Sequence, residues 1–156
     1  MKLETERLFV YPVENGTMRE LINNETDAQL KQAYSEMLEG CLKDPENRIW
    51  SAVWFIEPKG SPGVIAGDLS FKGPPDDGAV EIGYGLREGF CKKGYMTEAV
   101  KAVCGWAFSQ NGVLRVEAET DPDNLASQKV LASCGFAPAG TYGEEGPRFT
   151  LERTSP

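Results

Sequence analysis

One stretch of the sequence, residues 79–120, constrains the fold more than any other because it reads as strand, helix and strand. It begins with AVEIGYGL, in which every second residue is large and apolar, as expected of a strand with one buried face. A helix follows from about Gly94 to Ser109, ends at Asn111-Gly112 and leads into the strand VLRVEAET. This order favours a mixed sheet covered by helices, and therefore an α/β protein.

The rest of the chain adds strands before this unit and a short helix with further strands after it. Strands alternate with turn signals such as PKGSPG and GPPDDG, and the tryptophans are expected in the core. Without a repeat or an internal linker, residues 1–153 are predicted to form one domain, with 154–156 as a loose tail. The predicted strands are Leu8 to Pro12, Ile49 to Glu57, Gly63 to Phe71, Thr141 to Tyr142 and Arg148 to Glu152; the predicted helices are Met18 to Asn24, Ala28 to Leu42 and a short one from DPDN to Gly135.

The chain is acidic, with 24 Asp and Glu against 16 Lys and Arg among 156 residues and a net charge of -8. This charge argues against binding to nucleic acid or to an anionic membrane and favours a cationic partner. The N-terminal sequence MKLETERLFVYP lacks the apolar core of a signal peptide, and no later run is long enough to span a membrane. We therefore expect a cytoplasmic protein.

Cysteine and histidine usage narrows the chemistry. The four cysteines form no CxxC pair, as expected of reduced thiols, and the chain has no histidine. Nucleophilic catalysis that needs a histidine is thereby excluded, and no metal site is predicted. A general base must be a carboxylate, a lysine, a tyrosine, a cysteine or a water molecule.

The segment FCKKGYMTEAV, residues 90–100, places two lysines and a glycine at the start of the central helix. A helix that opens on glycine directly after a strand exposes backbone N–H groups and the positive end of its dipole, which together attract an anion. Lys92, Lys93 and Arg87 add positive charge there. Two lysines beside a helix start are also common on a solvated surface, so the loop needs support from elsewhere in the chain.

That support comes from motifs in one order over nearly the whole chain. CKKGYMTEA resembles the coenzyme A loop of the GNAT N-acetyltransferases, most closely the ribosomal-protein N-terminal acetyltransferase (Rim-type) branch. TERL near the start, VEIGY at 80–84 and NLASxxVLxxxGF at 124–136 are similar to further motifs of that branch. Two loop positions depart from the pattern, because Cys91 replaces Gln or Arg and Met96 replaces Gly or Ala. The resemblance implies a GNAT fold, with a largely antiparallel twisted sheet of about six or seven strands flanked by helices.

The same resemblance implies acetyl-CoA as acyl donor and an amine as acceptor, which the acidic charge predicts to be cationic. The pantetheine arm is expected to pair with the strand near Leu86 and Arg87, where two parallel strands splay, and Glu81 to lie close to the thioester. The implied cofactor-binding residues are Leu86, Arg87, Cys91, Lys92, Lys93, Gly94, Tyr95, Met96, Asn124 and Ser127.

Acetyl transfer to an amine needs a base for the nitrogen and an acid for the leaving thiolate. Glu81 shares a nearly bare strand face with Ala79, Gly83 and Gly85 and is the predicted base, directly or through a water. The acid stays open between Ser127, which the resemblance suggests, and Tyr142.

Three further questions stay open on the sequence alone. Asn124 also suits a plain helix cap. A degenerate acyl-CoA binder without activity and a structural subunit are the alternative functions. A homodimer, as the oligomeric state, is a further possibility that the sequence does not decide.

Overall fold

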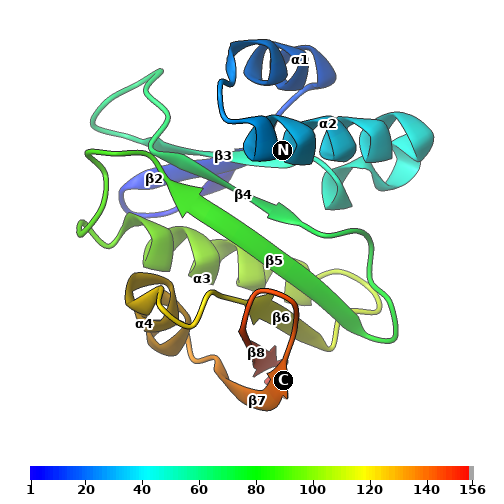
Figure 1. Cartoon of the computed structure of the whole chain (residues 1–156), viewed down its shortest axis with the longest axis vertical. Coiled ribbons are helices and arrows are strands. Elements are labelled where there is room, and N and C mark those ends of the chain that lie inside the picture. The colour runs from blue at the N-terminus through cyan, green and yellow to red at the C-terminus, as the bar shows by residue number, and fades with distance from the viewer. Residues whose placement is uncertain (155–156) are drawn as a thin grey trace.

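The computed structural model describes residues 1–154 and contains one eight-stranded sheet in the order β1-β2-β3-β4-β5-β6-β8-β7 (Figure 1). The predicted α/β class is confirmed. The strands are β1 (Leu3–Glu4), β2 (Leu8–Pro12), β3 (Val53–Pro58), β4 (Gly67–Phe71), β5 (Ala79–Leu86), β6 (Arg115–Glu119), β7 (Ala137–Tyr142) and β8 (Pro147–Glu152). The helices are α1 (Asn15–Asn24), α2 (Ala28–Lys43), α3 (Tyr95–Phe108), α4 (Leu125–Ser133) and a 3-10 helix, η1 (Pro45–Trp50).

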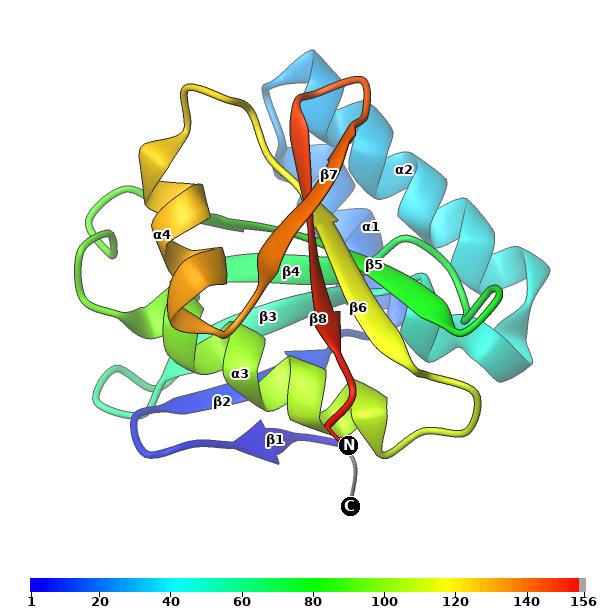
Figure 2. The ribbon, with the colours of Figure 1, turned by 90° about the horizontal axis from the view of Figure 1, so that it is seen from below.

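Helices cover both faces of the sheet. The pair α1 and α2 lies on one face, and α3 and α4 lie on the other (Figures 1 and 2). Buried apolar residues form a cluster on each side, the larger one around α3. Trp54 and Trp106 pack edge to face at 5.1 Å between ring centroids, and Trp50 joins them, as expected of core tryptophans. The centre of the sheet is therefore packed between two helical layers.

The sheet is antiparallel except at one place, where β5 and β6 run parallel as the ends of the β5-α3-β6 unit. Their pairing extends from Ala79 opposite Arg115 to Ile82 opposite Ala118 and then stops, although β5 continues to Leu86. The last four residues of β5 therefore have no partner on the β6 side within residues 1–154. The two strands splay apart, and the sheet opens beside the start of α3.

The sheet has eight strands, not the six or seven that the resemblance implied, and several predicted bounds were wrong. β7 begins at Ala137 rather than at Thr141, and α1 begins at Asn15 rather than at Met18. Ile49 and Trp50 belong to η1 rather than to a strand, because Pro45 begins a helical turn and Trp50 packs into the aromatic core. The strand predicted from Gly63 begins only at Gly67, and the two-residue β1 was not predicted. Tertiary packing overrides local β-propensity at these ends.

Residues 1–154 include no helix whose length and apolar character would let it cross a membrane. The predicted tail begins at Thr154, and its last two residues lie outside the described part of the chain.

Candidate active site

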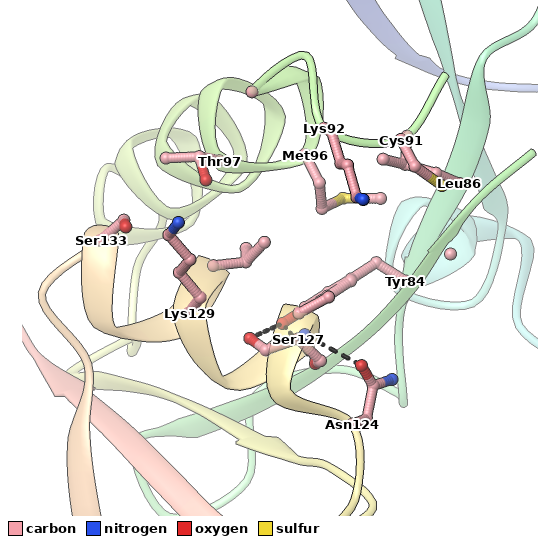
Figure 3. A pocket seen from close by; sticks show the side chains of 14 residues that line it. Tyr84, Leu86, Cys91, Lys92, Met96, Thr97, Asn124, Ser127, Lys129 and Ser133 are labelled. Carbon is pink, nitrogen blue, oxygen red and sulfur yellow. Dashed lines mark hydrogen bonds between the residues drawn. The ribbon is translucent and has the colours of Figure 1, made fainter. Parts of the chain in front are cut away.

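A cleft of about 750 Å³ lies where the end of β5, the start of α3 and the first turns of α4 meet (Figure 3). Lys92 lines it from the loop before α3 and Lys129 from α4, so positive charge reaches the cleft from two elements. The cleft is lined by Tyr84, Gly85, Leu86, Cys91, Lys92, Gly94, Met96, Thr97, Asn124, Ala126, Ser127, Lys129, Val130 and Ser133.

The start of α3 has the properties of an anion site. Gly94 precedes the helix with φ +78°, a conformation that favours glycine, and no side chain caps the helix start. The N–H groups of the first turn therefore stay available, and the helix dipole adds partial positive charge. Lys92, with φ +64°, also bends the loop sharply around this point. A phosphate group would meet both the amides and the lysine here.

Seven of the ten predicted cofactor residues line this cleft: Leu86, Cys91, Lys92, Gly94, Met96, Asn124 and Ser127. Met96 is almost fully buried and belongs to the core beneath the cleft, which accounts for a large side chain at this loop position. Arg87 lines a second cleft instead.

Two predicted cofactor residues have other contacts. The Lys93 ammonium lies 5.9 Å from the Phe90 ring centroid, and the Tyr95 ring lies under the Arg7 guanidinium at 4.9 Å. Neither residue is among those that line the two clefts in the described part of the chain.

The N-terminal TERL motif holds the loop in place. Arg7 donates from Nη1 to the Lys93 carbonyl at 2.8 Å and from Nε to Glu98 at 2.7 Å, while Thr5 also hydrogen-bonds Glu98. Burial raises the pKa of Glu98, but the hydrogen bonds from Thr5 and Arg7 outweigh it and leave this pKa below its usual value. Glu98 therefore anchors the first strands to α3.

Asn124 caps α4, as the simpler interpretation proposed: its Oδ1 accepts a hydrogen bond from the Ser127 N–H at 3.0 Å (Figure 3). The Ser127 hydroxyl is in turn 3.0 Å from the Tyr84 hydroxyl, which also donates to the Ser127 carbonyl at 3.2 Å. Burial raises the pKa of Tyr84 to about 12, so Tyr84 keeps its proton at neutral pH. The cap thus fixes a pair of hydroxyls at the mouth of the splay.

Sequence reasoning missed Tyr84 as a site residue, because strand alternation assigned it to the face buried under helices. Its place near the carboxyl end of a strand that leads into the loop is the signal that could have found it. The other proposed acid, Tyr142, lies on β7, is 76% exposed and lines neither cleft.

A second cleft, of about 570 Å³, lies on the opposite face of the sheet under α1 and α2. Carboxylates predominate in it, with Glu25, Asp68, Glu119, Asp121 and Glu145 against Lys72 and Arg87. Five residues line both clefts, and all lie at the splay between β5 and β6 or at the start of α4: Tyr84, Gly85, Leu86, Asn124 and Ser127. The two clefts therefore meet through the opening in the sheet.

Glu81, the predicted base, is engaged by two cations. One carboxylate oxygen lies 2.9 Å from Lys72 Nζ and the other 2.9 Å from Arg148 Nη2. Burial raises the pKa of Glu81, but the hydrogen bonds from Lys72 and Arg148 outweigh it, and the pKa lies below its usual value. Glu81 is also not among the described residues that line either cleft. Its role as general base stays a prediction.

Arg148, which sequence reasoning did not single out, connects three strands. Besides Glu81 on β5 it contacts Glu119 at 2.7 Å and Glu117 at 3.5 Å, both on β6, from its own place on β8. Three carboxylates side by side would repel one another without this guanidinium. Arg148 therefore holds β8 against the two strands that form the opening.

The fold and the two clefts define an α/β protein in which a lysine-lined cleft and an acidic cleft meet at a gap in the sheet. The sequence of residues 5–137 matches the family description "Acetyltransferase (GNAT) domain". The chain belongs to this family, and the resemblance noted from its motifs is confirmed.

Part of the chain is also similar in sequence to known proteins. The chain is 38% identical over 84 residues to the uncharacterized N-acetyltransferase YjdG of Bacillus subtilis, covering 53% of this chain and 49% of that protein. It is 44% identical over 59 residues to the probable N-acetyltransferase YjcK of Bacillus subtilis, covering 38% of this chain and 33% of that protein. The matched region thus spans less than half the length of either relative.

Solved structures share the fold. RimL, a ribosomal L7/L12 alpha-N-protein acetyltransferase in complex with coenzyme A, superposes with a TM-score of 0.74 at 17% identity, over 97% of this chain and 98% of that chain. The ribosomal-protein-S5-alanine acetyltransferase from Vibrio fischeri has a TM-score of 0.74 at 18% identity, over 97% and 96% of the two chains. Identities this low show likeness of fold.

Proposed function

We propose that this protein transfers the acetyl group of acetyl-CoA to a primary amine by direct attack of the amine on the thioester. The observation that carries the proposal is the meeting of two clefts of opposite charge at Tyr84, Gly85 and Ser127. A donor with phosphates suits the first cleft, with Lys92, Lys129 and the free helix start, which is the proposed cofactor cleft. A cationic acceptor suits the acidic second cleft under α1 and α2, which is the proposed acceptor cleft.

Acetyl-CoA would lie with its pyrophosphate at the amides around Gly94 and beside Lys92. Its pantetheine arm would run toward the unpaired end of β5, where backbone groups from Gly83 to Leu86 face the splay. The complex of RimL with coenzyme A supports this assignment, because that protein shares the fold. The thioester would then reach the opening between the two clefts.

The reaction needs two proton movements. The ammonium form of the acceptor must lose one proton before its nitrogen can attack the carbonyl carbon, and the carbon–sulfur bond then breaks as the thiolate takes up another proton. Ser127, with the protonated Tyr84 hydroxyl beside it, is the proposed donor to sulfur. Glu81, the base predicted from sequence, is one candidate to take the first proton; because it does not line the acidic cleft, it would need a bridging water.

The acceptor is proposed to be a cationic amine in the cytoplasm, either a protein N-terminus or a small amino compound. The name of the RimL neighbour supports the first, and the acidic cleft under α1 and α2 supports both.

Thiol release from acetyl-CoA tests the proposal. The panel contains peptides with free N-terminal Ala or Ser, spermidine, 1,5-diaminopentane and an aminoglycoside, with neutral and acidic amines as controls. We expect release with at least one cationic amine at a rate that falls as salt is added. Binding of acetyl-CoA without release would favour the degenerate binder, and neither binding nor release would favour the structural subunit.

The Lys92→Glu, Lys93→Glu double variant should bind acetyl-CoA about 10- to 100-fold more weakly, because the two cations of the loop that leads to the start of α3 become anions. Its affinity should also lose most of its dependence on salt. Calorimetric titration at low ionic strength measures both. A Lys31→Glu, Lys43→Glu variant makes the same charge change on α2, outside the residues that line the cofactor cleft. Equal affinities in the two double variants would contradict phosphate binding by this loop.

A further inference from the structure

One carboxylate of the acceptor cleft differs in its surroundings from Glu81, Glu98 and Glu119, the paired carboxylates described above. Asp68 lies on β4, is mostly buried, and its Oδ2 accepts a hydrogen bond from the Tyr34 hydroxyl of α2 at 2.7 Å. Tyr34 is itself only 4% exposed, so the donor of this bond is buried. The contact fixes the Asp68 carboxylate at the floor of the cleft.

Asp68 has no cationic side chain within 4.0 Å among residues 1–154, whereas Glu81, Glu98 and Glu119 each have an arginine or lysine. Burial raises the pKa of Asp68, and the nearby Glu25 adds to this, while Tyr34 and Arg87 lower it in part. Lys72, the other cation of the cleft, is paired with Glu81. A mostly buried carboxylate without a cation costs free energy that a bound ammonium group would recover.

Strand register places this carboxylate at the opening in the sheet. Asp68 lies directly opposite Gly85 in the antiparallel pair of β4 and β5, so both residues face the same side. Gly85 lines both clefts, and a side chain built on it would meet no atom within 4 Å. The space between Asp68 and the opening is therefore free of a β5 side chain. Glu81 is four residues from Gly85 on β5, so it lies roughly 13 Å from Gly85 at the rise per residue of a strand.

We propose that Asp68, held by Tyr34, binds the ammonium group of the acceptor at the opening and takes one of its protons, after which the neutral amine attacks the thioester. This inference rests on the proposed acetyl transfer and assigns to Asp68 the role that sequence reasoning predicted for Glu81. One proton passes from nitrogen to Asp68, the carbon–nitrogen bond forms, the carbon–sulfur bond breaks, and the second proton reaches sulfur directly or through Ser127. Asp68 then releases its proton to solvent.

The pKa values agree with this role. A carboxylate whose pKa lies above its usual value is a stronger base, and Tyr34 stays protonated because burial, followed by the Asp68 charge, raises the pKa of its hydroxyl. Tyr34 can therefore donate its hydrogen bond throughout the pH range of an assay.

The test compares Asp68→Asn with Glu81→Gln, two changes that keep shape and remove one carboxylate each. We expect Asp68→Asn to lower kcat/KM for every panel amine that the wild type acetylates by about 10²- to 10³-fold, with acetyl-CoA affinity unchanged. The loss should shrink as pH rises toward the pKa of the amine. Glu81→Gln should lose less than about tenfold. The reverse ranking would overturn the inference and support Glu81 as base.

Tyr34→Phe supplies a readout that a merely structural role would not move. Loss of the Tyr34 hydroxyl removes a hydrogen bond that lowers the pKa of Asp68, so the acidic limb of the kcat/KM profile should shift to higher pH. An unshifted limb would overturn the inference.

Binding of spermidine and 1,5-diaminopentane to the full chain, measured by calorimetry without acetyl-CoA, separates this inference from the proposed function. If no amine is acetylated but wild type binds these amines and Asp68→Asn does not, the ammonium site stands and the transfer reaction fails. Two results would overturn the inference. In the first, the wild type neither binds nor acetylates any of the panel amines. In the second, Asp68→Asn binds these amines and acetylates them as well as the wild type does.

Discussion

Replacing Gly94 by valine should weaken acetyl-CoA binding by at least about 100-fold, the largest loss expected from any single change in the loop. Gly94 has φ +78°, which a β-branched side chain adopts only with strain, and its backbone forms the start of α3. A Cβ atom there would lie 3.2 Å from Arg7 Nη2, the guanidinium that holds the loop. The added side chain would also occupy the space through which a phosphate reaches the amides.

Gly112→Val is the matched control for this prediction. Gly112 follows the other end of α3 with φ +83°, and a Cβ atom there would meet nothing within 4 Å. The two variants should lose similar thermal stability from backbone strain, but only Gly94→Val should lose acetyl-CoA affinity in calorimetric titration. A Gly94→Val protein that is folded and binds acetyl-CoA as tightly as Gly112→Val would rule out the helix start as the phosphate site.

Replacing Arg148 by methionine should lower the free energy of unfolding by about 2–3 kcal/mol, less than for a fully buried pair because the side chain is 22% exposed. Methionine preserves an unbranched apolar stem but removes the charge that connects Glu81, Glu117 and Glu119. The three carboxylates would then repel one another at the edge of the splay. Urea unfolding at pH 7, followed by circular dichroism, measures the loss.

The pH dependence of this loss has a defined sign. The pKa values of Glu81 and Glu119 are lowered in the folded protein, so their stabilising contribution is present at neutral pH and disappears as pH falls through those lowered values. The difference between wild type and Arg148→Met should therefore shrink below the ordinary glutamate pKa of about 4.3. Arg153→Met, at an exposed position just after β8, should change stability by less than about 0.5 kcal/mol. Equal losses in the two arginine variants would show that the cluster does not stabilise the fold.

Much of the architecture could be predicted because its signals are local. The strand AVEIGYGL, the helix that follows Gly94 and its end near Gly112 depend on side-chain alternation, apolar spacing and positive-φ glycines, which act within a few residues. The same local signals located the loop, and four of its predicted cofactor residues, Cys91, Lys92, Gly94 and Met96, line one cleft. Their binding of acetyl-CoA stays a prediction that titration decides.

Local signals failed where long-range packing sets the conformation. Ile49 and Trp50 have strand-forming side chains, yet they lie in η1 because Trp50 packs against Phe71 and Trp106, residues distant in sequence. Tyr84 alternates correctly as a buried strand residue, but the splay that exposes its hydroxyl to Ser127 exists only once β5 and β6 are paired and then part.

By itself, then, the sequence determined an acidic α/β chain with a glycine-led helix start, because composition, periodicity and turn chemistry are properties of neighbouring residues. Only the tertiary structure decided which carboxylates form ion pairs. Glu81 meets Lys72 and Arg148 through the register of β5 with the strands around it, whereas Asp68 is hydrogen-bonded by the Tyr34 hydroxyl and has no salt-bridge partner among residues 1–154. A carboxylate's pKa depends on the charges and the burial within a few ångströms of it, and folding assembles those neighbours from distant parts of the chain.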